Sequence, residues 1–348
     1  MTGAGEEQSV WVPGMELRDD WLAQVQEDIV EPDREIVDPH HHLWQRGATY
    51  ELDEFRADTG SGHRVVQSVF IECRAYYDPE VEERFRPVSE TRTAAAMARQ
   101  TEADATRIDG IVAFADLRDP QLDAVLDAHL EAGQGLVKGV RQSGACDPEP
   151  DKLAIPGRGA PGLYADPDFR RGLARLGERG LTYDTWHYHH QAGDFLDLAR
   201  AVPGTTIILD HFGTPLGVGR FTGQRDRIFA QWQRDMEDLA RCPNVVAKLG
   251  GLAMPDNGWG WHKAERPPTS DEFIAAQGPW YRHMIECFGP DRCMFESNFP
   301  VDRTGISYPV LWNAFKKMAA DYDLAARDAL FAGTARRIYR LPSTVPPN

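Results

Sequence analysis

The chain has 348 residues, of which 42% are hydrophobic, so it can bury a large core. Its formal net charge of -16 comes without any run of Lys or Arg, which argues against a nucleic acid partner and against an anionic membrane surface. The five cysteines are scattered and form no CxxC pair, which is typical of reduced thiols in a cytoplasmic protein. No signal peptide and no transmembrane helix is predicted. The expected partner is a small-molecule substrate, and a homo-oligomer is possible.

The first 34 residues are predicted to form an N-terminal helical arm, because residues 17–33 read as a short amphipathic helix that Pro32 closes. From Ile36 onward, short β-rich runs alternate with helical patterns. Eight strands are predicted, at residues 35–40, 65–72, 109–116, 135–141, 180–186, 205–211, 244–250 and 292–297. Helical patterns lie between them, for example at residues 92–106, 120–133, 167–180, 192–204 and 227–242.

Eight alternating units predict an α/β fold, a single (β/α)8 TIM barrel over residues 35–342 that follows the arm at residues 1–34. The competing arrangement is a doubly wound open sheet, which a Gly-rich strand-to-helix fingerprint would favour. That fingerprint is absent, since the glycines at residues 157–162 do not directly follow a predicted strand. Catalytic residues of a parallel barrel lie at the C-terminal ends of its strands, so these ends form the candidate site.

Three consecutive histidines end the first predicted strand. Side chains alternate along a strand, so His40 and His42 are expected to point together into the barrel mouth, while His41 points away. Their spacing suits two ligands of one metal ion, and His211 at the end of the sixth predicted strand would add a third imidazole. The structural alternatives are a hydrogen-bonded core pair for His40 and His42 and a loop-capping role for His211.

Several motifs follow one another in order along almost the whole chain: IVDPHHHLW, WHYHHQ, ILDHFG, NVVAKLGGLAM, RCMFESNFPVD and LFAGTARRIYRL. From about residue 34 to residue 341, this set resembles the amidohydrolase superfamily, in the amidohydrolase-related group of TIM-barrel hydrolases that includes sugar and dicarboxylate lactonases. The resemblance implies that His40, His42 and His211 hold a divalent metal ion, zinc or manganese, although some lactonases of the group need no ion. It also implies that position 298, at the end of the eighth strand, activates the attacking water.

At position 298 the chain departs from the family, which commonly has Asp there. An amide such as Asn298 cannot take a proton at neutral pH, but it could orient a water or donate a hydrogen bond to a developing oxyanion. Glu296 and Asp302 are the candidate replacement bases. The structural alternatives are a buried ion pair between Glu296 and Lys248, and a turn or helix cap formed by Asp302.

Arg141 ends the fourth predicted strand, where its guanidinium could bind a substrate carboxylate through two hydrogen bonds. The alternative for this residue is an ion pair with a neighbouring carboxylate such as Glu72. A polar aromatic rim after the fifth predicted strand and a Gly-rich lid after the seventh could also contact substrate, and the structural alternatives are a surface rim and a hydrophobic plug. The candidate residues in these two segments are Trp186, His187, His189 and Trp261.

Together these features predict a hydrolase of a small ester, with a lactone of a carboxylate-bearing compound as the expected substrate. A bound metal ion would lower the pKa of water and polarise the carbonyl, whereas without an ion the imidazoles would polarise it themselves. One alternative is a nonoxidative decarboxylase of an aromatic acid, which the resemblance makes less favourable because such enzymes usually keep the Asp that Asn298 replaces. The other is a degenerate, non-catalytic relative that has lost its base.

Overall fold

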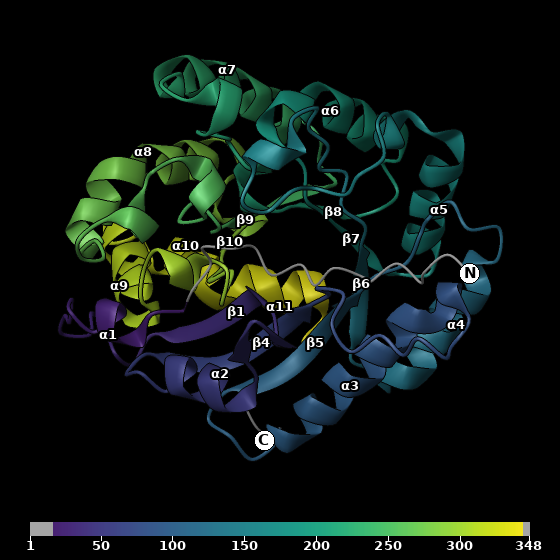
Figure 1. Cartoon of the computed structure of the whole chain (residues 1–348), viewed down its shortest axis with the longest axis horizontal. Coiled ribbons are helices and arrows are strands. Elements are labelled where there is room, and N and C mark those ends of the chain that lie inside the picture. Colours follow the sequence, from purple (N-terminus) through teal and green to yellow (C-terminus); the bar gives the residue numbers. More distant parts are fainter. Residues whose placement is uncertain (1–16, 344–348) are drawn as a thin grey trace, which may run out of the picture.

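A barrel of eight parallel strands forms the centre of the computed structural model, which describes residues 17–343 (Figure 1). Each strand pairs with the next barrel strand along the chain. The barrel strands are β1 (Glu35–His41), β4 (Arg64–Ile71), β5 (Arg107–Ala113), β6 (Val137–Arg141), β7 (Thr182–Thr185), β8 (Ile207–Leu209), β9 (Val245–Leu249) and β10 (Cys293–Phe295). All eight predicted strands overlap with these, and the (β/α)8 barrel is confirmed.

Helices surround the barrel (Figure 1), and the five predicted helical patterns correspond to α3 through α7. In α7, Ile228, Trp232, Met236 and Leu239 are buried at intervals of three to four residues, which places one apolar stripe against the strands. A short hairpin, β2 (Trp44–Arg46) and β3 (Ala48–Tyr50), follows β1. The helices are α1 (Asp19–Leu22), α2 (Leu52–Thr59), α3 (Arg86–Gln100), α4 (Leu122–Gly133), α5 (Pro167–Glu178), α6 (Ala192–Ala201), α7 (Arg225–Ala240), α8 (Ser270–Phe288), α9 (Tyr308–Met318), α10 (Leu324–Asp328) and α11 (Thr334–Tyr339).

The barrel closes where the chain that follows β10 meets β1. The backbone N–H of His42 donates to the carbonyl of Phe299 at 2.8 Å, and the N–H of Asn298 donates to the carbonyl of His40 at 3.0 Å. These bonds bring the histidines of the first strand beside residue 298 at the C-terminal end of the barrel. The side chain of Tyr339 on α11 is buried among apolar side chains of the strands, including Val37 and Ile208, and Figure 1 shows α11 lying across the barrel.

Residues 17–34 pack against the barrel as an arm with a single helical turn, α1, so the helix predicted over residues 17–33 is shorter than expected. Beyond this turn, tertiary hydrogen bonds also hold the segment. The indole N–H of Trp21 donates to the carbonyl of Ala264 at 3.1 Å, and the backbone N–H of Val30 donates to Asn313 Oδ1 at 2.9 Å. The backbone therefore follows the surface of the barrel rather than its own helical pattern.

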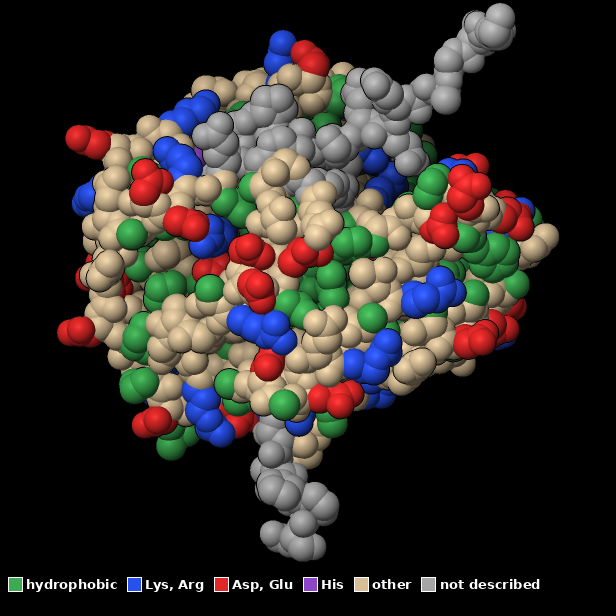
Figure 2. Space-filling model, turned by 60° about the horizontal axis from the view of Figure 1, so that its bottom comes forward, with side chains coloured by type: hydrophobic (Ala, Val, Ile, Leu, Met, Phe, Trp, Pro, Cys, Tyr) green, Lys and Arg blue, Asp and Glu red, His purple; other side chains and the backbone are tan. Residues whose placement is uncertain are grey.

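On the face in Figure 2, Lys and Arg side chains lie interspersed with Asp and Glu side chains rather than in one continuous strip. Within residues 17–343, no helix combines the length and the apolar character that a membrane crossing requires.

Candidate active site

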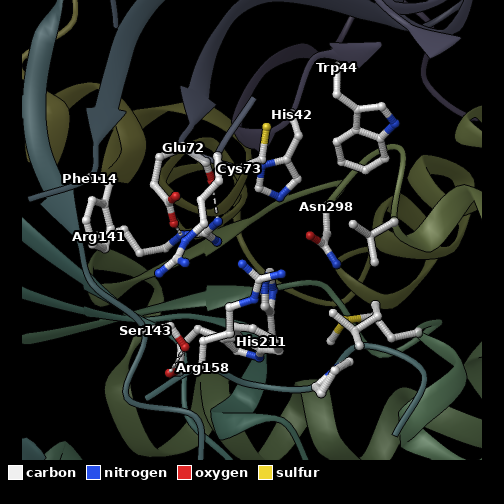
Figure 3. Close-up of a pocket in the computed structure, with 16 residues that line it drawn as sticks. His42, Trp44, Glu72, Cys73, Phe114, Arg141, Ser143, Arg158, His211 and Asn298 are labelled. Atoms are coloured by element: carbon white, nitrogen blue, oxygen red, sulfur yellow. Dashed lines mark hydrogen bonds and ion pairs between the residues drawn. The ribbon is translucent and has the colours of Figure 1, made fainter. Parts of the chain in front are cut away.

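A pocket opens at the C-terminal ends of the barrel strands (Figure 3). Its volume is about 150 Å³, and since about 10–15 Å³ of this measure holds one water, it suits a small organic molecule rather than a polymer. The side chains that line it come from the ends of most strands and from the loops that follow them. They are His42, Trp44, Glu72, Cys73, Arg74, Phe114, Arg141, Ser143, Ile155, Pro156, Arg158, Trp186, His211, Met254, Asn298 and Val301.

The structure brings His40 and His42 together, with their Nε2 atoms 3.3 Å apart. His42 donates its Nδ1–H to the carbonyl of Ile71 at 2.8 Å, so its Nε2 carries a lone pair on the side of the pocket. His40 is fully buried just below. His41 points away and stacks on Phe55 with ring centroids 4.4 Å apart, as strand alternation requires.

Glu296 bridges two of the three candidate imidazoles. One carboxylate oxygen lies 2.7 Å from Nδ1 of His211, and the other lies 2.8 Å from Nδ1 of His40. A carboxylate in this position fixes both rings with Nε2 directed away from it, which is the usual support of a metal-binding histidine. Gly251 is required beside this bridge, because a Cβ on it would lie 2.4 Å from Nδ1 of His211.

Buried charges around the bridge do not balance. Lys248 Nζ lies 2.6 Å from Asp184 and 3.4 Å from Asp210, so it pairs with these aspartates rather than with Glu296 as the sequence suggested. With neutral imidazoles, the ion-pair network carries an excess of two negative charges. Its anions and cations are Glu72, Asp184, Asp210 and Glu296 against Arg141 and Lys248.

Burial raises the pKa of Asp210 to about 7 and that of Glu296 to about 8, and the nearby ammonium group of Lys248 only partly opposes the rise of both pKa values. Both oxygens of Asp210 and Oε2 of Glu296 also lack a hydrogen-bond donor. Proton uptake or one divalent cation would remove this excess of negative charge.

The donor set fits such a cation. Two nitrogens that bind one tetrahedral ion at about 2.0–2.1 Å lie roughly 3.3–3.4 Å apart, which matches the separation of the Nε2 atoms of His40 and His42. Ligand atoms of His40, His211 and Glu296 also lie within 4.8 Å of one another. The distances of Glu296 to the two Nδ1 atoms are those of hydrogen bonds, so we assign it to orienting the rings rather than to direct ligation.

Asn298 reaches the pocket, whereas Asp302 lies behind it. The amide nitrogen of Asn298 donates to Asp302 Oδ1 at 2.9 Å, so the amide oxygen is the end left for the pocket. Asp302 also accepts the backbone N–H of Ala253 at 3.1 Å. Burial raises the pKa of Asp302 to about 8, and the hydrogen bonds from Asn298 and Ala253 oppose that rise. Neither Glu296 nor Asp302 lines the pocket, so neither carboxyl is placed to take a proton from water there directly.

Arg141 lines the pocket but is already engaged by Glu72. Its Nε donates to Glu72 Oε1 at 2.8 Å, its Nη2 donates to the Glu72 carbonyl, and its Nη1 lies 3.4 Å from His40 Nε2. The ion pair that was the alternative to carboxylate binding is therefore present. Only part of the guanidinium remains available to a substrate.

Sequence reasoning missed two further arginines of the pocket, Arg74 and Arg158. In Figure 3 the Arg158 side chain lies beside His211, across the pocket from His42. Its loop packs closely on the chain near residue 145. A Cβ on Gly157 would lie 2.1 Å from the carbonyl of Ala145, and the glycine at 159 is equally crowded. Two glycines that flank one arginine were thus the signal in the sequence for a loop pressed against the pocket.

Of the other predicted substrate contacts, only Trp186 lines the pocket. His187 follows it on the opposite side of the chain, where it is buried against Phe195 with ring centroids 4.6 Å apart. His189 accepts the backbone N–H of Leu216 at 3.2 Å, outside the pocket. Trp261, on the predicted lid, packs partly buried against the core instead. The structure does not bring these last three residues to the pocket.

A family model described as amidohydrolase matches residues 37–341 of the chain. The uncharacterized protein y4mH of Sinorhizobium fredii is 32% identical over 330 residues, which cover 88% of this chain and 98% of that protein. An L-fucono-1,5-lactonase of Burkholderia multivorans is 30% identical over 259 residues, which cover 72% of this chain and 78% of the lactonase. A crystal structure of an amidohydrolase from Burkholderia multivorans with bound zinc is 25% identical, with a TM-score of 0.71, and the match covers 89% of this chain and all of that one.

Proposed function

Because this chain belongs to the amidohydrolase family, we propose that it is a lactonase whose substrate carries a carboxylate. The observation that carries the proposal is the joint presence of imidazoles and three guanidinium groups, those of Arg74, Arg141 and Arg158, in one small pocket. Guanidinium groups bind carboxylates through paired hydrogen bonds, and imidazoles can transfer protons as general acids or bases in ester hydrolysis. The lactonase named among the relatives supports the same reaction class.

In this mechanism the attacking water lies between Asn298 and His211. Asn298 Oδ1 accepts one hydrogen of the water and orients it, and His211 Nε2 takes the other proton as the water oxygen attacks the lactone carbonyl. Burial lowers the pKa of His211 to about 3, so its ring is neutral at neutral pH, and its Nε2 holds the lone pair for this step when Glu296 is ionised. The ring C–O bond then breaks, and the proton passes from His211 to the leaving alkoxide, which yields a hydroxy acid.

The carboxylates expected from the sequence to act as bases take a supporting role. Ionised Glu296 accepts Nδ1–H of His211 and so keeps the lone pair on Nε2, while Asp302 holds Asn298. A divalent cation bound by His40, His42 and His211 would occupy Nε2 of His211. In that state the cation, rather than His211, would lower the pKa of the attacking water, and it would polarise the carbonyl. When Glu296 is protonated, its O–H donates to His211 Nδ1 instead, and the ring presents Nε2–H to the carbonyl.

A second candidate is decarboxylation of an aromatic acid. Its supporting observation is the aromatic lining of the same pocket by Trp44, Phe114 and Trp186, which suits a flat ring beside the arginines.

The test compares hydrolysis of small lactones with and without a carboxylate, followed as acid release, in the wild type, Arg158→Gln and the exposed control Arg171→Gln. Hydrogen bonds to charged groups contribute roughly 1.5–3 kcal/mol, so Arg158→Gln should raise KM for the carboxylate-bearing lactones roughly 10- to 100-fold. KM for neutral lactones should not change, and Arg171→Gln should behave like the wild type. Failure to hydrolyse any lactone would refute the proposal, and release of CO2 from an aromatic acid would establish the second candidate.

A further inference from the structure

We infer that Asn298 and Asp302 form one functional unit, in which Asp302 is a positioning residue that decides which end of the Asn298 amide enters the pocket. The catalytic consequence of this inference rests on the proposed hydrolysis, but the coupling between the two side chains does not. Both residues are at most 1% exposed, and four positions separate them in the turn that follows β10.

The backbone of the turn holds the pair in place. Asn298 has a positive φ of 55°, its N–H donates to the carbonyl of His40, and its own carbonyl accepts the N–H of Asp302 at 3.1 Å. This leaves the amide of Asn298 little freedom except rotation about its last bond. That rotation exchanges a hydrogen-bond donor for an acceptor in the pocket.

Asp302 selects between the two orientations. The backbone N–H of Ala253 donates to one of its oxygens, and Asn298 Nδ2 donates to the other at 2.9 Å. When Asp302 is ionised, both of its oxygens act as acceptors, so the amide of Asn298 turns its NH2 group toward Asp302. Figure 3 shows the amide of Asn298 at the pocket, with its oxygen on the pocket side. An acceptor at this place can orient water, whereas the oxyanion-donor role considered from the sequence would need the opposite orientation.

If the two residues act together, replacing Asn298 by the family's aspartate alone should not create a carboxylate that is free to act as a base. Asn298→Asp would place two carboxyl groups at hydrogen-bond distance in a buried turn, where both cannot be ionised together. Asp302→Asn would offer an NH2 group to Asn298, which would satisfy it by flipping its amide and presenting NH2 to the pocket. Exchanging the two residues, Asn298→Asp with Asp302→Asn, restores one donor and one acceptor and leaves a carboxylate oxygen in the pocket.

The experiment measures kcat, KM and the unfolding temperature for both single variants, the exchanged double variant and the exposed control Asp226→Asn. In Asp302→Asn, kcat should fall roughly 100-fold with little change in KM, because the water is misoriented while substrate contacts persist. Asn298→Asp should lower the unfolding temperature, and the double variant should recover both kcat and stability. Asp226→Asn should match the wild type.

Additive effects of the two substitutions, in kcat and in unfolding temperature alike, would overturn the inference. So would full activity and stability in Asn298→Asp alone. If the wild type hydrolyses no lactone, the proposed function fails. The unfolding temperatures of the wild type, the two single variants and the double variant still decide whether the two residues are coupled. A crystal structure of Asp302→Asn would show the hydrogen-bond partners of residue 298. An amide that keeps its wild-type contacts in this variant would contradict the inference that Asp302 determines its orientation.

Discussion

Replacing Glu296 by Gln tests how the imidazoles are held for a metal ion. One oxygen of the Glu296 carboxylate accepts from Nδ1 of His211 at 2.7 Å, and the other contacts Nδ1 of His40 at 2.8 Å. Glutamine has one oxygen and one NH2 group, so it can accept from one ring but must donate to the other. That second ring then carries its proton on Nε2, where it can no longer bind an ion.

The expected magnitude follows from these contacts. One charge-assisted hydrogen bond is lost, which corresponds to roughly 1.5–3 kcal/mol. Metal affinity should therefore fall about 10- to 100-fold, the range typical of losing an outer partner of a ligating histidine. The metal-free variant should unfold at no lower temperature than the metal-free wild type, because one unbalanced buried charge has been removed.

The assay is competition for zinc with a chromogenic chelator, together with elemental analysis and thermal unfolding of the metal-free proteins. Glu90→Gln is the matched control, since Glu90 is equally buried and accepts the backbone N–H of Cys73 and Ala75 at 3.1 and 2.7 Å and the thiol of Cys73 instead of contacting the imidazoles. Its zinc affinity should equal that of the wild type. Unchanged affinity in Glu296→Gln, or no zinc binding by the wild type, would refute the reasoning from charge and geometry.

Two predictions concern stability. Burial lowers the pKa of His63 and His129 to about 4 and that of His187 to about 3, from 6.5. Between pH 7 and 5 the unfolded chain takes up protons on these rings while the folded chain does not, so each should lower the free energy of unfolding by about 2 kcal/mol at pH 5. Replacing His129 by Gln should remove its share of this pH dependence of stability. A urea midpoint with the same pH dependence in this variant and in the wild type would contradict the prediction. Lys248→Met should cost roughly 3–5 kcal/mol by leaving Asp184 unpaired, and removing both charges should cost less; equal losses in the single and double variants would argue against the pair.

Local patterns in the sequence determined the barrel and the direction of its first-strand histidines. The alternation of strands and helices, and the spacing of two between His40 and His42, depend on neighbours along the chain, so they could be predicted without distances. The exchange of Asp for Asn298 was also visible in the sequence. The role of Asn298 could not be predicted, because the hydrogen-bond partner and the orientation of its amide depend on how the turn after the last strand folds.

Only the tertiary structure decided the roles of the charged groups. Glu296 meets His211 across 85 residues, and Arg141 meets Glu72 across 69. Such contacts depend on the register of neighbouring strands and on loop paths, which no local pattern contains. Arg158 likewise reaches the pocket through tertiary packing, because the glycines on both sides of it pack against the chain at residues 144–145. The sequence determines the chemical groups that each residue carries. The folded structure determines which groups lie within hydrogen-bond distance of one another, and these partners determine the protonation and the function of the residue.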